Sequence, residues 1–353
     1  MRVRYTLLLL LLMPFFSLFA QNPQFSFFSW AQPYFNPAAI GEKENHLNFI
    51  GFYRESPMRD SVPTNTGERA PGDAESNRNF IQNGQREVLL HIDSYIKKIK
   101  GGIGITFLSD KDGRTDKAGF SIGYAQKFRI RNGKLGVGVQ LGFLNQAPPK
   151  ISDFIANDNP NNDPTLHGLN STESFLDFDM NFGLNYRTPT WYVGLSGTNL
   201  TGGGVRISGA EISSLRVGRQ YYLTGGYILN LRTVVPWAIE PNVLINTSNF
   251  AIWRINVMAL ARYNGILWFG LSYQHNNAIV VLLGATPFYN STNDYLRGLE
   301  LGFAYGFDTK KSAYVKGGTW GDFEIVFRYG FNFYKEKTLT GYGSSRHLYK
   351  NQY

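Results

Sequence analysis

The stretch SFLDFDMNFGLNYR at Ser174–Arg187 alternates strictly between apolar side chains and polar or small ones. Because a β-strand points successive side chains to opposite faces, the stretch predicts a strand with one apolar face. In water that face needs a second sheet. In lipid it needs only a sheet that closes on itself, so that no backbone group lacks a partner. The apolar set is Leu176, Phe178, Met180, Phe182, Leu184 and Tyr186, and the other set is Asp177, Asp179, Asn181, Gly183, Asn185 and Arg187.

The same alternation recurs through residues 45–333, in runs long enough for tilted membrane strands. We therefore predict an all-β fold, a transmembrane antiparallel β-barrel of about 14 strands of the outer-membrane type. A soluble β-sandwich or propeller is the alternative, but neither needs aromatic-rich faces on nearly every strand. The predicted strands are 45–55, 86–97, 101–109, 117–129, 134–145, 174–188, 190–199, 218–231, 235–247, 251–264, 266–275, 277–288, 297–308 and 321–333.

The connections indicate which way the barrel faces. Long polar stretches at 56–85, 146–173 and 200–217 alternate with tight turns in the first half of the barrel, and Asn264–Gly265 has the residues of a type I′ hairpin. In the second half, 248–250 and 275–277 are short where a long loop is expected, and 288–296 is long where a tight turn is expected. Outer-membrane barrels have long external loops and short periplasmic turns. We expect the long stretches outside the cell and both ends of the barrel in the periplasm.

The N-terminus predicts export. Arg2 and Arg4 precede an apolar run that ends near Ala20, so residues 1–20 read as a signal peptide. A membrane anchor is the alternative, but the run is shorter than the roughly 20 residues of a comfortable spanning helix. This divides the chain into a signal peptide (1–20), an N-terminal periplasmic or plug segment (21–44), the barrel (45–333) and a C-terminal periplasmic tail (334–353).

Composition excludes several kinds of chemistry. The chain has 353 residues, no cysteine and a net charge of +9, with no run of Lys and Arg longer than two. We expect no disulfide framework and no nucleic-acid partner, and basic residues at a barrel rim are expected to meet outer-membrane lipid or lipopolysaccharide. The five histidines do not pair at metal-ligand spacing, and neither a nucleophile elbow nor a phosphate-binding loop occurs. We expect no enzyme, no metal and no cofactor.

The two ends of the mature chain are the candidate partner-binding regions. The N-terminal segment is too aromatic for a free tail, and its prolines prevent a long helix, so it must be buried in the lumen mouth or against a partner. The tail interleaves basic and tyrosine side chains, which suits a binding surface, with a loose tail as the alternative. The predicted partner-binding residues are Phe25, Trp30, Phe35, Asn36, Pro37, Tyr342, Arg346 and Tyr349.

Motifs at both ends resemble a known family. Asn22-Pro23-Gln24-Phe25-Ser26 and Phe35-Asn36-Pro37-Ala38 stand near the start, and Phe323-Glu324-Ile325 with Arg328-Tyr329 stands near the end. This arrangement resembles the PorP/SprF family of Bacteroidetes outer-membrane proteins. Weaker similarities lie between them, in order, at Trp191–Leu200, Tyr221–Tyr227, Pro241–Ile245 and Trp268–Tyr273.

The resemblance implies a non-enzymatic outer-membrane component of the type IX secretion or gliding machinery. Such a protein is expected to act with the periplasmic ring lipoprotein and peptidoglycan-associated components, or to help a secreted adhesin reach the surface. Asn22 in place of the usual Asp, the long 56–85 stretch and the 334–353 tail leave open whether it is a core component or a helper for one substrate. A channel for small or hydrophobic solutes is the alternative function.

Overall fold

The structure, a computed structural model, describes a barrel and a segment inside it. It covers residues 24–43, 46–56, 85–112, 115–147, 174–202, 206–208, 218–231, 236–275, 278–291, 293, 296–308 and 321–332. The predicted signal peptide, most of the long 56–85 and 146–173 stretches and the 334–353 tail lie outside these residues. No helix in the described part of the chain is long and apolar enough to cross a membrane.

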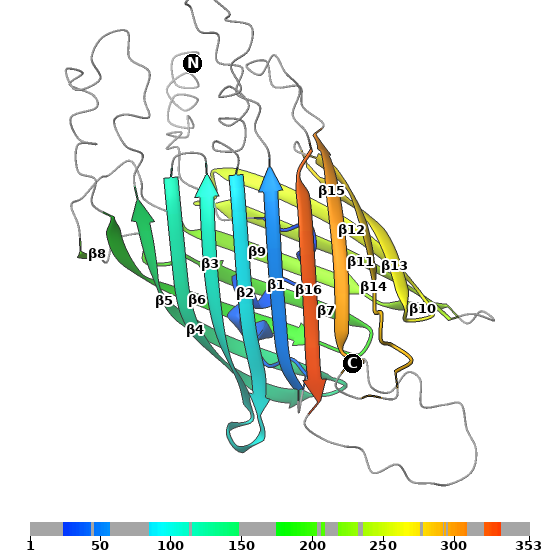
Figure 1. Cartoon of the computed structure of the whole chain (residues 1–353). Coiled ribbons are helices and arrows are strands. Elements are labelled where there is room, and N and C mark those ends of the chain that lie inside the picture. Colours follow the sequence, from blue (N-terminus) through cyan, green and yellow to red (C-terminus); the bar gives the residue numbers. More distant parts are fainter. Residues whose placement is uncertain are drawn as a thin grey trace, which may run out of the picture.

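The strands form one antiparallel sheet that closes into a ring (Figure 1). In sequence order they are β1 (His46–Ser56), β2 (Gln85–Ile96), β3 (Gly101–Asp112), β4 (Thr115–Ile130), β5 (Gly133–Ala147), β6 (Phe175–Arg187), β7 (Trp191–Thr198), β8 (Arg206–Ser208), β9 (Gln220–Tyr227), β10 (Leu229–Leu231), β11 (Trp237–Ser248), β12 (Ile252–Tyr263), β13 (Leu267–Gln274), β14 (Ala278–Ala285), β15 (Leu299–Asp308) and β16 (Phe323–Asn332).

The ring closes in two places that the sequence order does not join directly. β1 pairs with β16 from His46 opposite Asn332 to Glu55 opposite Phe323, and β9 pairs with both β7 and β11. β9 and β10 form one strand interrupted at Ile228, and the short β8 pairs only with β6 beside the ring. Within the described residues the barrel therefore has 14 strands, which confirms the predicted fold and strand number.

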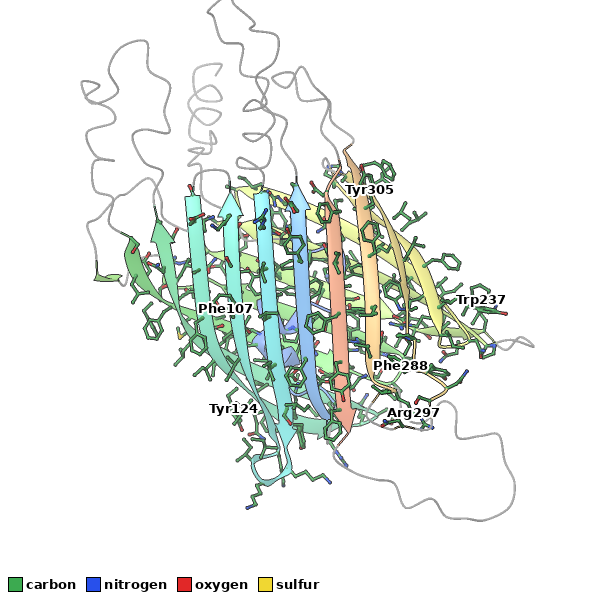
Figure 2. All side chains as sticks on the ribbon, in the orientation of Figure 1. Phe107, Tyr124, Trp237, Phe288, Arg297 and Tyr305 are labelled. Atoms are coloured by element: carbon green, nitrogen blue, oxygen red, sulfur yellow. The ribbon has the colours of Figure 1, made fainter. Side chains whose placement is uncertain are left out.

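The predicted apolar faces point outward. In β6, Met180, Phe182 and Leu184 are 37–43% exposed, whereas Asp177 and Asn185 are 3% exposed inside the barrel. Similar outward apolar rows cover most of the other strands, for example Ile103, Ile105 and Phe107 on β3, and Figure 2 labels Phe107 among the side chains drawn on the sheet. An outward apolar surface on a closed sheet is what a bilayer requires.

The tight turns that join β4 to β5, β6 to β7 and β12 to β13 lie at the end of the barrel where β1 begins and β16 ends, but residues 249–251 join β11 to β12 just as tightly at the opposite end. Residues Asn264 and Gly265 have φ angles of 51° and 68°, the positive values that a type I′ turn needs, as predicted. Helix η2 (Lys97–Ile99) joins β2 to β3 at the same end, beside the turn that joins β4 to β5. Strand direction places the long 56–85 and 146–173 stretches at the opposite end.

The facing of β6 gives a direct test. Phe182→Arg places a cation in lipid, which costs about 2–4 kcal/mol near the bilayer midplane. Its neighbour Asn181 lines a pocket inside the barrel, so Asn181→Arg stays in contact with water. We expect the Phe182 variant to lose most of its folded, heat-modifiable form on gel electrophoresis and the Asn181 variant to retain it. Equal losses would contradict the facing.

Candidate functional site: the segment inside the barrel

Residues 24–43, here called the plug segment, cross the inside of the barrel. They contain two short helices, α2 (Gln32–Phe35) and η1 (Pro37–Ala39), and form the dark blue ribbon behind β1 and β2 in Figure 1. Phe27 and Ile40 are completely buried. The short helices follow from Pro33 and Pro37, which fit the first turn of a helix but cannot continue one.

The first half of the plug segment packs against an apolar part of the inner wall. The ring of Phe25 lies 4.7 Å from that of Phe52 on β1, and Phe27 and Trp30 lie 5.3 and 5.1 Å from Trp268 on β13. Each aromatic side chain that leaves water in this way contributes roughly 1.5–3 kcal/mol. The wall residues in this cluster include Leu89, Leu244, Met258, Leu260, Val280, Leu282 and Val326.

The second half of the plug segment lies against glycines. A Cβ atom at Gly138 on β5 would overlap the backbone of Pro37 and Ala38, and one at Gly136 would lie 2.5 Å from the Ala38 carbonyl oxygen. Any side chain at these positions would push the plug backbone away, so only glycine permits this close approach. The glycines that contact the plug segment, here called the glycine band, are Gly102, Gly104, Gly123, Gly136, Gly138, Gly183 and Gly194.

Asn36 fixes the plug segment at the glycine band. Its side-chain oxygen accepts a hydrogen bond from the Ala38 amide at 3.0 Å and so caps helix η1. Its side-chain nitrogen donates to the Leu184 carbonyl on β6 at 3.1 Å. The side chain thus joins the turn of the plug to the barrel wall.

Charged wall residues satisfy the backbone of the plug segment, which has little regular structure of its own. Glu324 on β16 accepts hydrogen bonds from the Ser26 amide at 2.7 Å and the Phe27 amide at 3.3 Å. Lys127 donates to the Ala38 carbonyl at 2.6 Å, and Asp93 accepts from the Gly41 amide at 2.5 Å. Buried backbone groups need such partners, so the polar wall residues stabilise a segment that could not be buried otherwise.

Two ionic clusters contact the plug segment, one at Trp30 and one at Glu42. Arg262 contacts Glu240 at 2.6 Å and Glu300 at 3.2 Å, and Arg328 also pairs with Glu300. The Arg328 guanidinium lies 4.5 Å from the centre of the Trp30 ring, a cation–π contact.

The second cluster surrounds Glu42 at the end of the plug segment. Glu42 lies 3.5 Å from Lys127 and 3.4 Å from Arg187, and it accepts a hydrogen bond from Asn185 at 3.1 Å. Burial opposes its ionisation, but the two cations outweigh burial and lower the pKa of Glu42. Burial, with Arg328 nearby, lowers the pKa of Lys43 to about 8.

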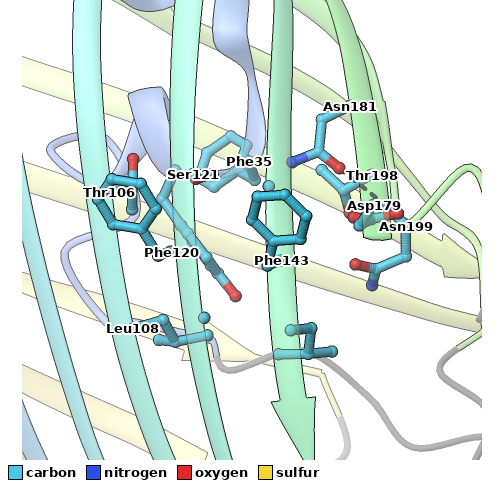
Figure 3. Close-up of a pocket in the computed structure, with 14 residues that line it drawn as sticks. Phe35, Thr106, Leu108, Phe120, Ser121, Phe143, Asp179, Asn181, Thr198 and Asn199 are labelled. Atoms are coloured by element: carbon cyan, nitrogen blue, oxygen red, sulfur yellow. Dashed lines mark hydrogen bonds between the residues drawn. The ribbon is translucent and has the colours of Figure 1, made fainter. Parts of the chain in front are cut away.

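A small pocket remains beside the plug segment. Tyr34 and Phe35 line it together with apolar side chains such as Leu108, Phe120 and Phe143 and polar side chains from β3, β4, β6 and β7. Asp179, Asn181 and Thr198 gather on one side and Thr106 and Ser121 on the other (Figure 3). Within the described residues, no three His, Cys, Asp or Glu side chains gather in a way that could hold a metal ion.

The structure places the predicted partner-binding residues in two groups. Phe25, Trp30, Phe35, Asn36 and Pro37 are all buried inside the barrel, so a partner reaches them only if the plug segment leaves the lumen. This arrangement corresponds to the plug alternative for the segment. Tyr342, Arg346 and Tyr349 lie outside the described residues.

Sequence reasoning missed the glycine band, Lys127 and Asp93. The alternate glycines of β5 are visible in the sequence, but the pattern does not show that a second segment lies against them. Glu324 stands in the closing motif of the sequence, and its two bonds to the plug amides give it a structural role. These bonds also bring together the two sequence motifs that stand near opposite ends of the chain.

A family model described as the type IX secretion system membrane protein PorP/SprF matches residues 76–329. The chain belongs to the PorP/SprF family. Members of this family are outer-membrane proteins, so the predicted family and location are confirmed. No curated protein sequence matches the chain.

Solved structures show the same fold at low sequence identity. A "TodX deltaS2S3 mutant monoaromatic hydrocarbon channel" is 13% identical, with a TM-score of 0.50, over 86% of this chain and 94% of that one. A Pseudomonas aeruginosa FadL homologue is 14% identical, with a TM-score of 0.39, over 90% of this chain and 96% of that one. At 13% identity the comparison with the TodX channel shows a shared barrel fold for this PorP/SprF protein and nothing more.

The glycine band predicts how the plug of this PorP/SprF barrel can be loosened. Gly138→Ala forces the plug backbone away at an expected cost of about 1–3 kcal/mol, so the ratio of undocked to docked segment should rise roughly 5- to 150-fold. The matched control is Gly119→Ala on β4, whose Cβ would meet Leu144 at an ordinary 3.5 Å. In planar bilayers we expect the Gly138 variant to conduct more ions than the wild type. The Gly119 variant should conduct as the wild type does. Unchanged conductance in both would contradict docking at the band.

Glu42 predicts how docking depends on pH. Because the pKa of Glu42 is lowered, ionised Glu42 stabilises the docked plug segment fully above its ordinary pKa of 4.5. This stabilisation is lost as the pH falls through the lowered pKa. Glu42→Gln should therefore speed hydrogen exchange of the plug amides at neutral pH, and the difference from wild type should shrink in acid. Glu55→Gln, whose carboxylate pairs with Arg86 away from the plug, is the control. Equal exchange in wild type and the Glu42 variant would show that the ionic cluster does not hold the segment.

Proposed function

We propose that this protein is a non-enzymatic outer-membrane component of the type IX secretion and gliding machinery. It supports export or surface attachment of proteins through contacts with periplasmic partners, namely the ring lipoprotein and peptidoglycan-associated components. Membership of the PorP/SprF family places it in type IX secretion, and the partner contacts and the gliding role are the proposal.

The single observation that carries the proposal beyond the family is the packed lumen. Aromatic side chains of the plug segment fill the apolar part of the inner wall, and the plug backbone lies directly on the glycine band. A barrel closed in this way is poorly suited to passing a folded protein or a steady flow of solute through its own lumen. It is suited to acting as a rigid platform whose rims meet other components.

Partner contacts at the periplasmic end then have two possible sources. The tail, with Tyr342, Arg346 and Tyr349, extends from the end of β16, where the tight turns also lie. The plug segment is a second source only if it leaves the lumen. The tail is therefore the first region to test.

A channel for small or hydrophobic solutes is the second candidate. The pocket bordered by Tyr34 and Phe35 favours it, since its lining of apolar and polar side chains leaves a space beside the plug segment for a small molecule. In that case the plug segment acts as a gate, and loosening it should increase solute passage without changing protein secretion.

Deleting residues 334–353 separates these functions. We expect a folded barrel that co-purifies with fewer periplasmic components in mild detergent and displays fewer secreted proteins on the cell surface. Replacing Phe25, Trp30 and Phe35 by Ala removes plug packing and serves as the comparison. Normal co-purification and secretion after the tail deletion would show that the tail is dispensable. If the aromatic replacements only open a conducting pore, the channel function gains support.

A further inference from the structure

The turns that join β2 to β3 and β4 to β5 carry a concentration of positive charge. Four cationic side chains lie there, here called the basic sector: Lys97, Lys98, Lys100 and Arg131. Arg129 and Lys134 stand opposite each other on the face of β4 and β5 that also carries Lys127, which points into the barrel. The stretches 96–103 and 126–136 contain no Asp or Glu. In the described parts of the turns between β12 and β15, at the same end of the barrel, Arg297 is the only cation. Within the part of the rim that the structure describes, the positive charge is therefore concentrated on one side.

The two turns form one surface. The Lys127 amide donates to the Lys100 carbonyl at 3.0 Å, and the Gln126 side chain donates to the same carbonyl at 3.1 Å. Beyond them, the Tyr186 hydroxyl on β6 donates to the Ile130 carbonyl at 3.1 Å. These bonds hold neighbouring turns side by side, so their charges act together.

The basic sector borders the lipid-facing surface. Ile99, Phe128 and Ile130, which lie close to its cations in the sequence, are 41–47% exposed. Tyr124 and Tyr186 lie just inside the turns, and the Tyr186 ring packs on Trp191 at 5.3 Å; Figure 2 shows Tyr124 close to this end of the barrel. Tyrosine and tryptophan side chains are enriched at the membrane–water interface. The cations lie in the turns beyond these rings, further from the membrane centre, and therefore at the depth of the lipid headgroups.

We propose that the basic sector binds the headgroups of anionic phospholipids. These lipids belong to the leaflet at the end of the barrel where β2 joins β3 and β4 joins β5. The phosphate meets the cations and the acyl chains meet the exposed isoleucine and phenylalanine side chains. A protein surface could match the charge, but it would not account for apolar side chains beside the cations at the membrane boundary. Such binding would hold a layer of anionic lipid on one side of the barrel only.

Native mass spectrometry of the full-length protein in detergent, titrated with phosphatidylglycerol or phosphatidylcholine, tests the proposal. We expect wild type to prefer phosphatidylglycerol by about tenfold or more, since each basic residue near a membrane surface adds to the attraction. The triple variant Lys98→Gln, Lys100→Gln, Arg131→Gln should lose this preference. High salt should weaken it as well, because salt screens exposed charges.

The matched control removes three exposed cations at the opposite end of the barrel, with Arg86→Gln, Lys111→Gln and Arg219→Gln. It should keep the preference, and both triple variants should remain heat-modifiable barrels. Equal binding of the two lipids by wild type, or equal loss in both triple variants, would overturn the proposal. Stronger binding of lipid A than of phosphatidylglycerol at the basic sector would overturn the assigned leaflet.

Discussion

The pairing of β1 with β16 is the constraint on which the rest of the structure depends. Without it the sheet would present two rows of unpaired backbone groups to lipid, where no water can satisfy them. Closing the ring gives every strand two neighbours. It also separates an outer surface that contacts lipid from an inner surface that does not. The outward rows of apolar side chains and the charged inner wall both follow from this separation.

A closed ring of this width leaves a lumen that must be filled by water or by the chain itself. Here the plug segment fills it, and the wall is adapted along its length: apolar side chains meet Phe27 and Trp30, and glycines meet Pro37 and Ala38. Glu324, Lys127 and Asp93 satisfy plug backbone groups. The wall and the plug segment are therefore complementary in shape, polarity and hydrogen bonding. This complementarity indicates that the docked arrangement is the native state of the plug segment.

The sequence predicts the outside of this barrel better than its inside. Lipid imposes a simple alternation, so the facing of β6 and the positions of all 14 strands follow from side-chain type alone. The alternation is weaker over 266–288, and the structure gives the reason. Val280 and Leu282 face inward but are apolar because they lie in the cluster that packs on the plug segment, so β14 is apolar on both faces. On β13 one inward residue, Trp268, does the same beside the polar Ser272 and Gln274.

The plug was only partly predictable for a related reason. Aromatic residues and prolines show that residues 21–44 must be buried, but they do not show against what. The answer depends on Gly138 and on Glu324, which lie about 100 and 300 residues away in the chain. Their role appears only when the closed ring brings both to the inner wall.

The most direct test of the docked plug is photo-crosslinking in intact cells with a benzophenone amino acid in place of Phe25. Because the Phe25 ring lies 4.7 Å from Phe52, the account predicts an intramolecular link to the β1 peptide, with no increase in mass from a second protein. A link from this position to a separate periplasmic protein, without the link to β1, would contradict a segment docked in its own barrel.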